Sequence, residues 1–420
     1  MHPELLPTLR HYSLRLFRAD LFAGITVAMV ALPLSLAIAI ASGATPAQGL
    51  VTAVVAGFLI SALGGSQVQI GGPTGAFIVV VAGVIATHGY DGLVAATFLA
   101  GLILIVAGLL RAGSLIAFVP DAVIHGFTIG IGAIIATSQI KDLFGLTVDK
   151  VPADFLEKIP VLWAARGTIN IWAVVIGVGT IVLVAVLRRR APRLPGLIFA
   201  IALTSGIAAI AHLPIDTIGS RFGALPHTLP APHLPSISMD MIVTLLPSAF
   251  LIAFLAGIES LLSAIVADRM HQSSHRPNAE LLAQGFANLG SSLFGGLPAT
   301  GAIARTATNI RAGARTPVAG IVHAATLLLF MWVAAPLAGY LAMPALAGIL
   351  MLTAWNMTEP HHWRDHLRLP WPDLFLLVLT LLLTLLVDLT TAIGTGVALG
   401  LLIRWIRGKH GAETWTTPDR

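Results

Sequence analysis

Two short stretches of the sequence decide the fold: Ile70-Gly-Gly-Pro-Thr-Gly-Ala76 and Gly295-Gly-Leu-Pro-Ala-Thr-Gly-Ala302. Both lie between long apolar runs. Glycines and β-forming residues discourage a helix before each proline, and a proline in the first helical turn favours a helix after it. Such a helix begins partway through an apolar segment and leaves several N–H groups without a partner. Each stretch therefore predicts a short helix that starts deep inside the protein.

The second stretch repeats the first. Gly75 and Gly301 are 226 positions apart, and the same offset carries Pro33 onto Glu259. Seven apolar segments precede the segment that contains Glu259, and an odd number turns the second half upside down relative to the first. Inverted repeats with matching segments broken by Gly and Pro are typical of transporter sites at the bilayer midplane.

The composition places these segments in a membrane. Of 420 residues, 56% are hydrophobic, 10% are charged and none is cysteine, whereas soluble domains average roughly 25% charged residues. This excludes a soluble globular protein, low-complexity disorder, a disulfide scaffold and a thiolate metal site. We predict an all-α polytopic membrane protein with about fourteen transmembrane segments, at 22–43, 48–63, 70–88, 92–110, 114–138, 169–187, 194–212, 241–267, 278–296, 300–312, 315–334, 336–356, 371–387 and 389–406.

The positive charges orient these segments. With the N-terminus inside, Lys141, Lys150, Lys158, Arg166 and Arg221 fall outside and Arg305 falls within a span, which leaves 18 of the 24 Lys and Arg residues inside. This bias predicts an integral protein of the cell (inner) membrane with both termini cytosolic, and it explains the basic surplus without nucleic acid. We expect a cytosolic amphipathic segment, a first repeat, an extracellular linker, a second repeat and a short cytosolic tail, at 1–21, 22–212, 213–240, 241–408 and 409–420.

The two short helices predict an anion site. Two facing N-termini, each carrying roughly half a positive charge, can bind an anion through backbone N–H groups alone. Arg305 follows Gly301 by one turn, and a charged residue deep in a membrane is functional by default. The alternatives are that the glycine stretches are only kinks, and that Arg305 snorkels to the cytosol. The predicted substrate-binding residues are Thr74, Gly75, Ala76, Gly301, Ala302, Ile303 and Arg305.

One carboxylate stands in the middle of a long apolar run, in Leu255-Ala-Gly-Ile-Glu259-Ser-Leu-Leu-Ser263. Glu259 is placed to bind a proton or to ligate sodium, and Ser263, one turn later, is on the same face. We predict that these two residues bind the coupling ion. The alternative is a structural acid paired with Arg305.

We predict no enzyme, cofactor or metal site. The chain has no HExxH motif and no phosphate-binding loop, and its serines lack a nucleophile setting. The cluster His361-His-Trp-Arg-Asp-His366 resembles a metal site, but beside arginines in an inside loop we interpret it as a solvated interfacial turn. Asp121 and His125, at a membrane boundary, are assigned a structural role.

At these residues the chain resembles the SulP family of anion transporters. The most specific pieces are Asp20-Leu-Phe-Ala-Gly-Ile-Thr-Val-Ala28, Ile70–Ala76, and Gly295-Gly-Leu-Pro-Ala-Thr-Gly-Ala-Ile-Ala-Arg-Thr-Ala-Thr-Asn309. The resemblance implies a seven-plus-seven inverted fold, a core domain that moves against a gate domain, and a homodimer. It also implies an anion between the third and tenth helices. The resemblance also implies a cytosolic STAS domain in family members, and we expect only a short tail after Arg407 in this sequence.

Departures from the family bear on the substrate. Leu34 and Ile38 replace a Gln and an aromatic residue of the first span; Glu259, Ser263 and Ile303 stand where sodium-dependent bicarbonate members carry oxygen ligands. Arg305 matches sulfate-type members. We predict proton-coupled uptake of sulfate or a similar dianion by alternating access. The alternatives are sodium-dependent bicarbonate transport, dicarboxylate or chloride exchange, an anion channel, a nucleobase permease and a non-transporting scaffold.

Overall fold

The computed structural model describes residues 2–10, 12–113, 119–148, 151–152, 154–191, 194–387 and 389–408. The predicted tail 409–420 and the first residues of the predicted segment 114–138 lie outside this part of the chain. The first half contains α1 (Leu5–Arg10), α2 (Leu14–Ala41), α3 (Pro46–Leu63), β1 (Gly71–Gly72), α4 (Phe77–Leu109), α5 (Asp121–Leu143), α6 (Phe155–Ala164), a 3₁₀ turn (Ala165–Thr168), α7 (Ile171–Arg190) and α8 (Gly196–Ile210).

The second half begins with a short outer helix and ends with two apolar helices. It contains α9 (Ile218–Phe222), α10 (Met239–His271), α11 (Pro277–Leu293), β2 (Thr300–Gly301), α12 (Ile303–Arg311), α13 (Val318–Ala338), α14 (Met343–Met357), a 3₁₀ turn (Pro360–His362), α15 (Trp363–His366), α16 (Trp371–Leu386) and α17 (Leu389–Gly408).

The helices confirm the predicted architecture. Within the described residues, eight are long and apolar enough to cross a membrane, namely α2, α3, α4, α5, α7, α10, α13 and α17. Two further apolar helices, α8 and α16, are shorter. α4 contains two of the predicted segments, because Gly89, at φ 71° and ψ −178°, divides it into two helices. With α11, α12 and α14, these helices account for the fourteen predicted segments.

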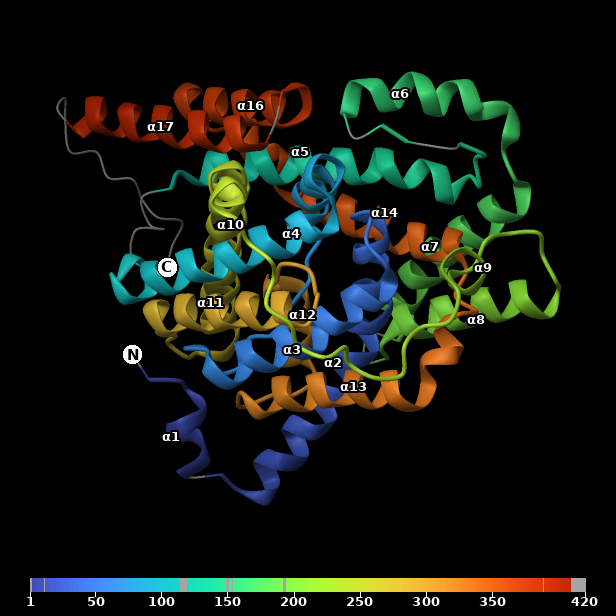
Figure 1. Ribbon diagram of the computed structural model, residues 1–420, viewed down its shortest axis with the longest axis horizontal. Coiled ribbons are helices and arrows are strands. Elements are labelled where there is room, and N and C mark those ends of the chain that lie inside the picture. Colours follow the sequence, from blue (N-terminus) through green and yellow to red (C-terminus); the bar gives the residue numbers. More distant parts are fainter. Residues whose placement is uncertain are drawn as a thin grey trace.

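The helices pack into two bundles that correspond to the core and gate domains (Figure 1). In the core bundle, α4 packs on α10 and α11, while α2 and α3 pack on α13. In the gate bundle, α5 packs on α14 and α16, and α14 packs on α7. Gly101 and Gly285 permit the close crossing of α4 and α11, since a Cβ at either position would lie within 2.9 Å of the other's carbonyl oxygen. The bundles meet where α2 contacts α8 and α14.

The predicted linker 213–240 connects the two bundles. After α9, the chain runs without helix from about residue 223 across the molecule to α10 (Figure 1). Near the gate bundle, the Ile218 N–H donates to Leu341 O (2.9 Å); near the core bundle, the His233 N–H donates to Leu293 O (2.8 Å). The linker is therefore held at both ends by backbone hydrogen bonds.

The first long helix begins earlier than the predicted span 22–43. α2 starts at Leu14, where the Ser13 side chain accepts a hydrogen bond from the Leu16 N–H (3.3 Å). Asp20 is fully buried, although the sequence places it in the cytosolic segment. Its carboxylate accepts from the backbone N–H groups of Arg315 (2.8 Å) and Thr316 (3.1 Å). The charge is tolerated inside because these donors satisfy it.

Candidate functional site

The two predicted short helices are present and begin at equivalent positions. α4 starts at Phe77 and α12 at Ile303, which are separated by the 226 residues of the sequence repeat. The first part of α4 ends before Gly89, and α12 has nine residues. At 1.5 Å per residue these helices are about 18 and 14 Å long, roughly half the thickness of a bilayer's apolar core. Each is therefore a half-helix.

A two-residue antiparallel ladder holds the two starts together. Gly71 pairs with Gly301, and Gly72 pairs with Thr300. The Ala302 N–H donates to Ile70 O at 2.8 Å, which extends the pairing by one bond. The glycines are required by this contact, because a Cβ on Gly301 would overlap the Gln69 amide and a Cβ on Gly72 would lie 2.6 Å from Arg305 Nη1. The ladder explains why both stretches are rich in glycine.

The half-helix starts offer unpaired backbone donors. Within the described residues, no group accepts a hydrogen bond from the amides of Gly75, Ala76, Ile303 or Ala304. The first such bond of α12 is made by the Thr306 N–H, which donates to Ala302 O at 2.8 Å. Unpaired amides at a helix N-terminus carry partial positive charge and can bind an anion.

Arg305 lies inside the protein, so the snorkelling alternative is wrong. Its side chain is 2% exposed, and Nη2 donates to the carbonyl of Pro73, directly before the α4 start. Nε and Nη1 have no hydrogen-bond partner among the described residues. Arg305 thus belongs to α12 but places its positive charge beside the start of α4.

Glu259 also reaches the α4 start. Its Oε2 accepts a hydrogen bond from the Thr74 hydroxyl at 2.8 Å. Among the described residues it forms no ion pair, so the pair with Arg305 that the alternative interpretation required is not formed. Ser263, also assigned to the coupling ion, is fully buried, and its hydroxyl lies 3.2 Å from Thr306 Oγ1. Ser263 therefore contacts α12 at Thr306, one residue after Arg305.

A buried polar network, missed in the sequence analysis, supports the ladder. The Gln69 amide donates to Ser260 Oγ (2.9 Å), which in turn donates to Glu280 Oε1 (2.9 Å). Glu280 Oε2 accepts from the Gly65 N–H (3.0 Å), and Gln284 Nε2 donates to Glu280 Oε1 (2.9 Å). The signal was the polar residues at four-residue spacing on α11, namely Glu280, Gln284 and Asn288, which marks one polar helix face.

The starts of α4 and α12 differ in how closely side chains of other helices pack against them. A Cβ on Gly75 would lie 3.3 Å from Met357 Sδ and 3.5 Å from Thr353 Cγ2, both on α14 of the gate bundle. Ile303, at the start of α12, is 42% exposed. On α2, Ile38 is buried and Leu34 is half-buried, so the wall formed by the first span is apolar.

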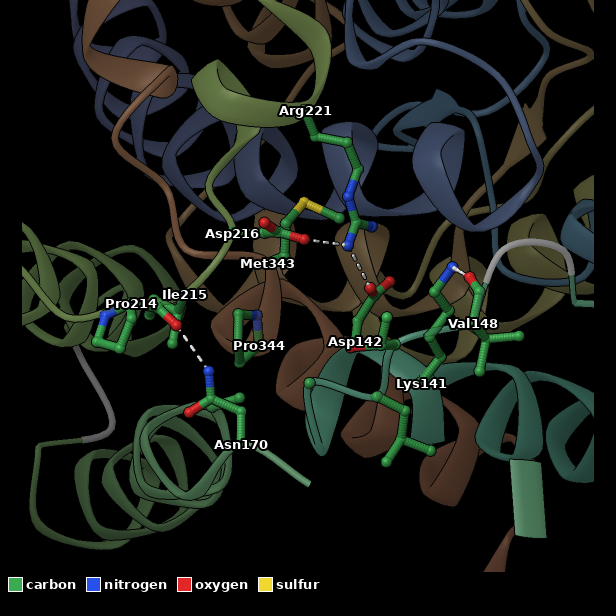
Figure 2. Close-up of a pocket in the computed structure, with 14 residues that line it drawn as sticks. Lys141, Asp142, Val148, Asn170, Pro214, Ile215, Asp216, Arg221, Met343 and Pro344 are labelled. Carbon is green, nitrogen blue, oxygen red and sulfur yellow. Dashed lines mark hydrogen bonds and ion pairs between the residues drawn. The ribbon is translucent and has the colours of Figure 1, made fainter. Parts of the chain in front are cut away.

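A cavity lined by charged side chains lies elsewhere, in the gate bundle. It has a volume of about 440 Å³ and lies where α5, α7, α9 and α14 meet. Figure 2 shows Arg221 reaching both Asp142 and Asp216, at 2.8 Å each, and Lys141 turned toward the Val148 carbonyl, 2.7 Å away. Because these charged groups are paired with each other or with backbone, this cavity offers no unpaired charge comparable to Arg305.

Two histidine features that the sequence separates come together in the structure. His125 of α5 lies beside Glu359 and His366, which follow α14. The cluster 361–366 is thus not solvated throughout, since the His366 side chain is only 12% exposed.

Comparison with known proteins identifies the family of this fold. The model of the sulfate permease family matches residues 17–380. The chain belongs to the sulfate permease family. The protein named "Putative sulfate transporter YvdB" of Bacillus subtilis is 45% identical over 371 residues, which cover 88% of this chain and 70% of that protein. The bicarbonate transporter BicA of Picosynechococcus sp. is 32% identical, and the match covers 80% of this chain and 61% of BicA.

Two solved transporter structures have the same fold. The transmembrane domain of a cyanobacterial BicA superposes with a TM-score of 0.81 at 29% identity, covering 91% of this chain and 99% of that one. SLC26A9 superposes with a TM-score of 0.87 at 17% identity, covering 96% of this chain and 68% of that one. Family, relatives and fold together support an integral membrane anion transporter rather than an enzyme.

Proposed function

We propose that this protein is a secondary active transporter that binds its anion between the starts of α4 and α12. The observation that carries the proposal is the pair of half-helices with unpaired amides, held together by the ladder, with the Arg305 guanidinium beside them. Thr74, Gly75, Ala76, Gly301, Ala302, Ile303 and Arg305 are the proposed binding residues. The core bundle then carries the anion past the gate bundle by alternating access.

The charges at the site favour a dianion such as sulfate. Two helix N-termini at roughly half a charge each and Arg305 amount to about +2. An ionised Glu259 reduces this to about +1, and protonation restores about +2. Sulfate therefore binds best when Glu259 carries a proton, which couples sulfate uptake to proton uptake. The bond from Thr74 to Glu259 supports this coupling, because it joins the carboxyl group to the α4 start.

The proposal is tested by sulfate flux into proteoliposomes that contain the protein. We expect an inward proton gradient to drive uptake. Glu259→Gln keeps the size and an acceptor for the Thr74 hydroxyl but cannot titrate, so we expect it to exchange sulfate without responding to the gradient. Asp240→Asn makes the same acid-to-amide change at the exposed start of the same helix, so it is the matched control and should keep the response. Gradient-driven uptake by Glu259→Gln would remove Glu259 from the coupling step.

A second candidate is sodium-dependent bicarbonate transport. The 32% identity to the bicarbonate transporter BicA favours bicarbonate as its substrate. Ser263 bonds to Thr306 and Ile303 offers no side-chain oxygen, so both residues favour a proton over sodium as the coupling ion. Flux that requires sodium and prefers bicarbonate would select this candidate. Saturable counterflow of chloride or a dicarboxylate would indicate exchange, and voltage-dependent conductance without saturation would indicate a channel.

The placement in the bilayer is proposed on the positive-inside bias: an inner-membrane protein with both termini in the cytosol. The proposed extracellular part is the linker 213–240. A homodimer is proposed from the family. Protease access to the two ends of the chain in right-side-out vesicles, and crosslinking in membranes, test these two points.

A further inference from the structure

We propose that His125, Glu359 and His366 form a binding site for a divalent transition metal such as Zn²⁺. One ligand atom from each of the three side chains lies within 4.8 Å of the other two. His125 Nδ1 is 3.0 Å from Glu359 Oε2, and His366 Nε2 is 3.9 Å from the same oxygen. Two imidazoles and one carboxylate are a ligand set that zinc accepts, with a fourth position open.

The fold brings these ligands together from distant parts of the chain. His125 lies one turn after the start of α5, in the first repeat; Glu359 follows the end of α14, and His366 ends α15. The backbone of Glu359 is left-handed, at φ 47°, a conformation that non-glycine residues adopt rarely and mainly where the surroundings enforce it. The Trp363 indole N–H donates to Thr358 O (2.6 Å) and the His362 N–H to Glu359 O (2.9 Å), and both bonds fix this turn.

Polar atoms of the cluster are buried without hydrogen bonds. Among the described residues, His366 Nδ1 and Glu359 Oε2 have no such partner. Glu359 Oε2 is the atom nearest to both imidazoles, although its contact with His125 lacks hydrogen-bond geometry. Buried polar atoms normally have partners. A cation shared by the carboxylate and the two rings would supply one to Glu359.

The cluster needs little rearrangement to hold a metal. Ligand atoms at about 2.0–2.2 Å from a tetrahedral zinc lie roughly 3.3–3.5 Å apart. The His125–Glu359 separation is already shorter, and His366 Nε2 has to approach Glu359 Oε2 by about 0.5 Å. The ligand atoms of the cluster lie within 4.8 Å of one another, so the widest separation has to close by at most about 1.5 Å. His362 Nδ1, 3.9 Å from Glu359 Oε2, is placed to act as a fourth ligand, or water can take that position.

The proposed metal site belongs to the gate bundle and lies near the α4 start. Glu359 follows Met357 by two residues, and Met357 Sδ lies close to Gly75 at the α4 start. A metal that fixes Glu359 also fixes the end of α14 over that start. Slower sulfate flux with bound zinc is therefore expected; this consequence rests on the proposed function, whereas zinc binding itself does not.

The test is equilibrium dialysis of the full-length, untagged protein in detergent against Zn²⁺ alone, with metal content measured per chain. We expect one high-affinity zinc per chain, and at least tenfold weaker binding in His125→Gln, in His366→Gln and in Glu359→Gln. His361→Gln is the matched control, since this exposed histidine of the same turn is not in the cluster. A spectrum of four-coordinate Co²⁺ that is lost in the same three variants would give independent support.

Three results would overturn the proposal: no stoichiometric zinc in the wild type, unchanged affinity in both His125→Gln and His366→Gln, or an equal loss in His361→Gln. Thermal unfolding without metal separates a binding defect from misfolding, and we expect His366→Gln to match the wild type. Zinc binding without an effect on flux would leave the site in place and remove only its link to the gate.

Discussion

The two half-helix starts have the same backbone role but different surroundings. At the α4 start, Thr74 is bonded to Glu259, Pro73 to Arg305, and Gly75 packs near Met357 of the gate bundle. At the α12 start, Ile303 and Ala304 are exposed, and no charged side chain of the described part of the chain bonds to either. The α4 start is covered by the gate bundle and lies beside the charged side chains of Glu259 and Arg305. The α12 start is exposed and apolar.

The repeat explains how this difference arose within one fold. The 226-residue offset carries Glu259 onto Pro33 and Arg305 onto Val79, so the first repeat has no charge at either equivalent position. Both charges come from the second repeat and reach across to the first. In the proposed mechanism, the backbone symmetry forms the anion site, and the side-chain asymmetry makes the α4 start the one that responds to protonation of Glu259 and to the gate bundle.

The largest effect is expected where the two starts touch. Gly301→Ala places a Cβ against the Gln69 amide, which bonds to Ser260 in the polar network. Overpacking costs about 1–3 kcal/mol, and loss of the buried hydrogen bonds adds to this. We expect a markedly lower unfolding temperature and no sulfate binding, measured by thermal shift with and without sulfate.

Gly75→Ala is the equivalent substitution at the other start. Its nearest neighbour is the flexible end of Met357, 3.3 Å away, so the protein should remain folded. Gly83→Ala, where a Cβ would meet no atom within 4 Å, is the control for a methyl group added in the same segment without a new contact. Equal destabilisation by Gly301→Ala and Gly75→Ala would contradict the difference described above.

The second-largest effect is expected for Arg305, whose side chain extends from the second repeat to the first. Arg305→Ala removes the donor to Pro73 and the only cationic side chain hydrogen-bonded at either start within the described residues. Charge-assisted hydrogen bonds contribute about 1.5–3 kcal/mol, so sulfate affinity should fall about 10- to 100-fold. Isothermal titration with sulfate measures this loss.

Arg305→Lys separates charge from geometry, because it keeps the charge but cannot reproduce the fork of the guanidinium. We expect it to bind sulfate with an affinity between those of Arg305→Ala and the wild type. If Arg305→Ala binds sulfate as the wild type does, the charge of Arg305 plays no part at the α4 start.

The sequence predicted the backbone of the site better than its side chains. Glycine, proline and a fixed offset are local signals, and they located both half-helix starts. Burial and partners depend on tertiary packing, so the bond from Thr74 to Glu259 had no local signal. The four-residue spacing of Glu280, Gln284 and Asn288 indicates a polar helix face but not the groups that it contacts. The same limit applies to His125 and His366, which the chain separates by 241 positions and the fold places with ring centroids 4.7 Å apart.

The smallest effect, and the most direct test of the comparison, is chemical access to the two starts. The chain has no cysteine, so a single introduced thiol reacts without background. We expect Ile303→Cys, at a position 42% exposed, to react with a polar maleimide at least about tenfold faster than Ala76→Cys, at a position 5% exposed. Adding Met357→Ala to Ala76→Cys removes the side chain nearest Gly75 and should raise that slow rate several-fold, while Ile303→Cys with the same change should not respond. Equal rates at the two thiols, or an equal response of both to Met357→Ala, would show that the gate bundle covers neither start preferentially, and the difference between the repeats would then be one of charge alone.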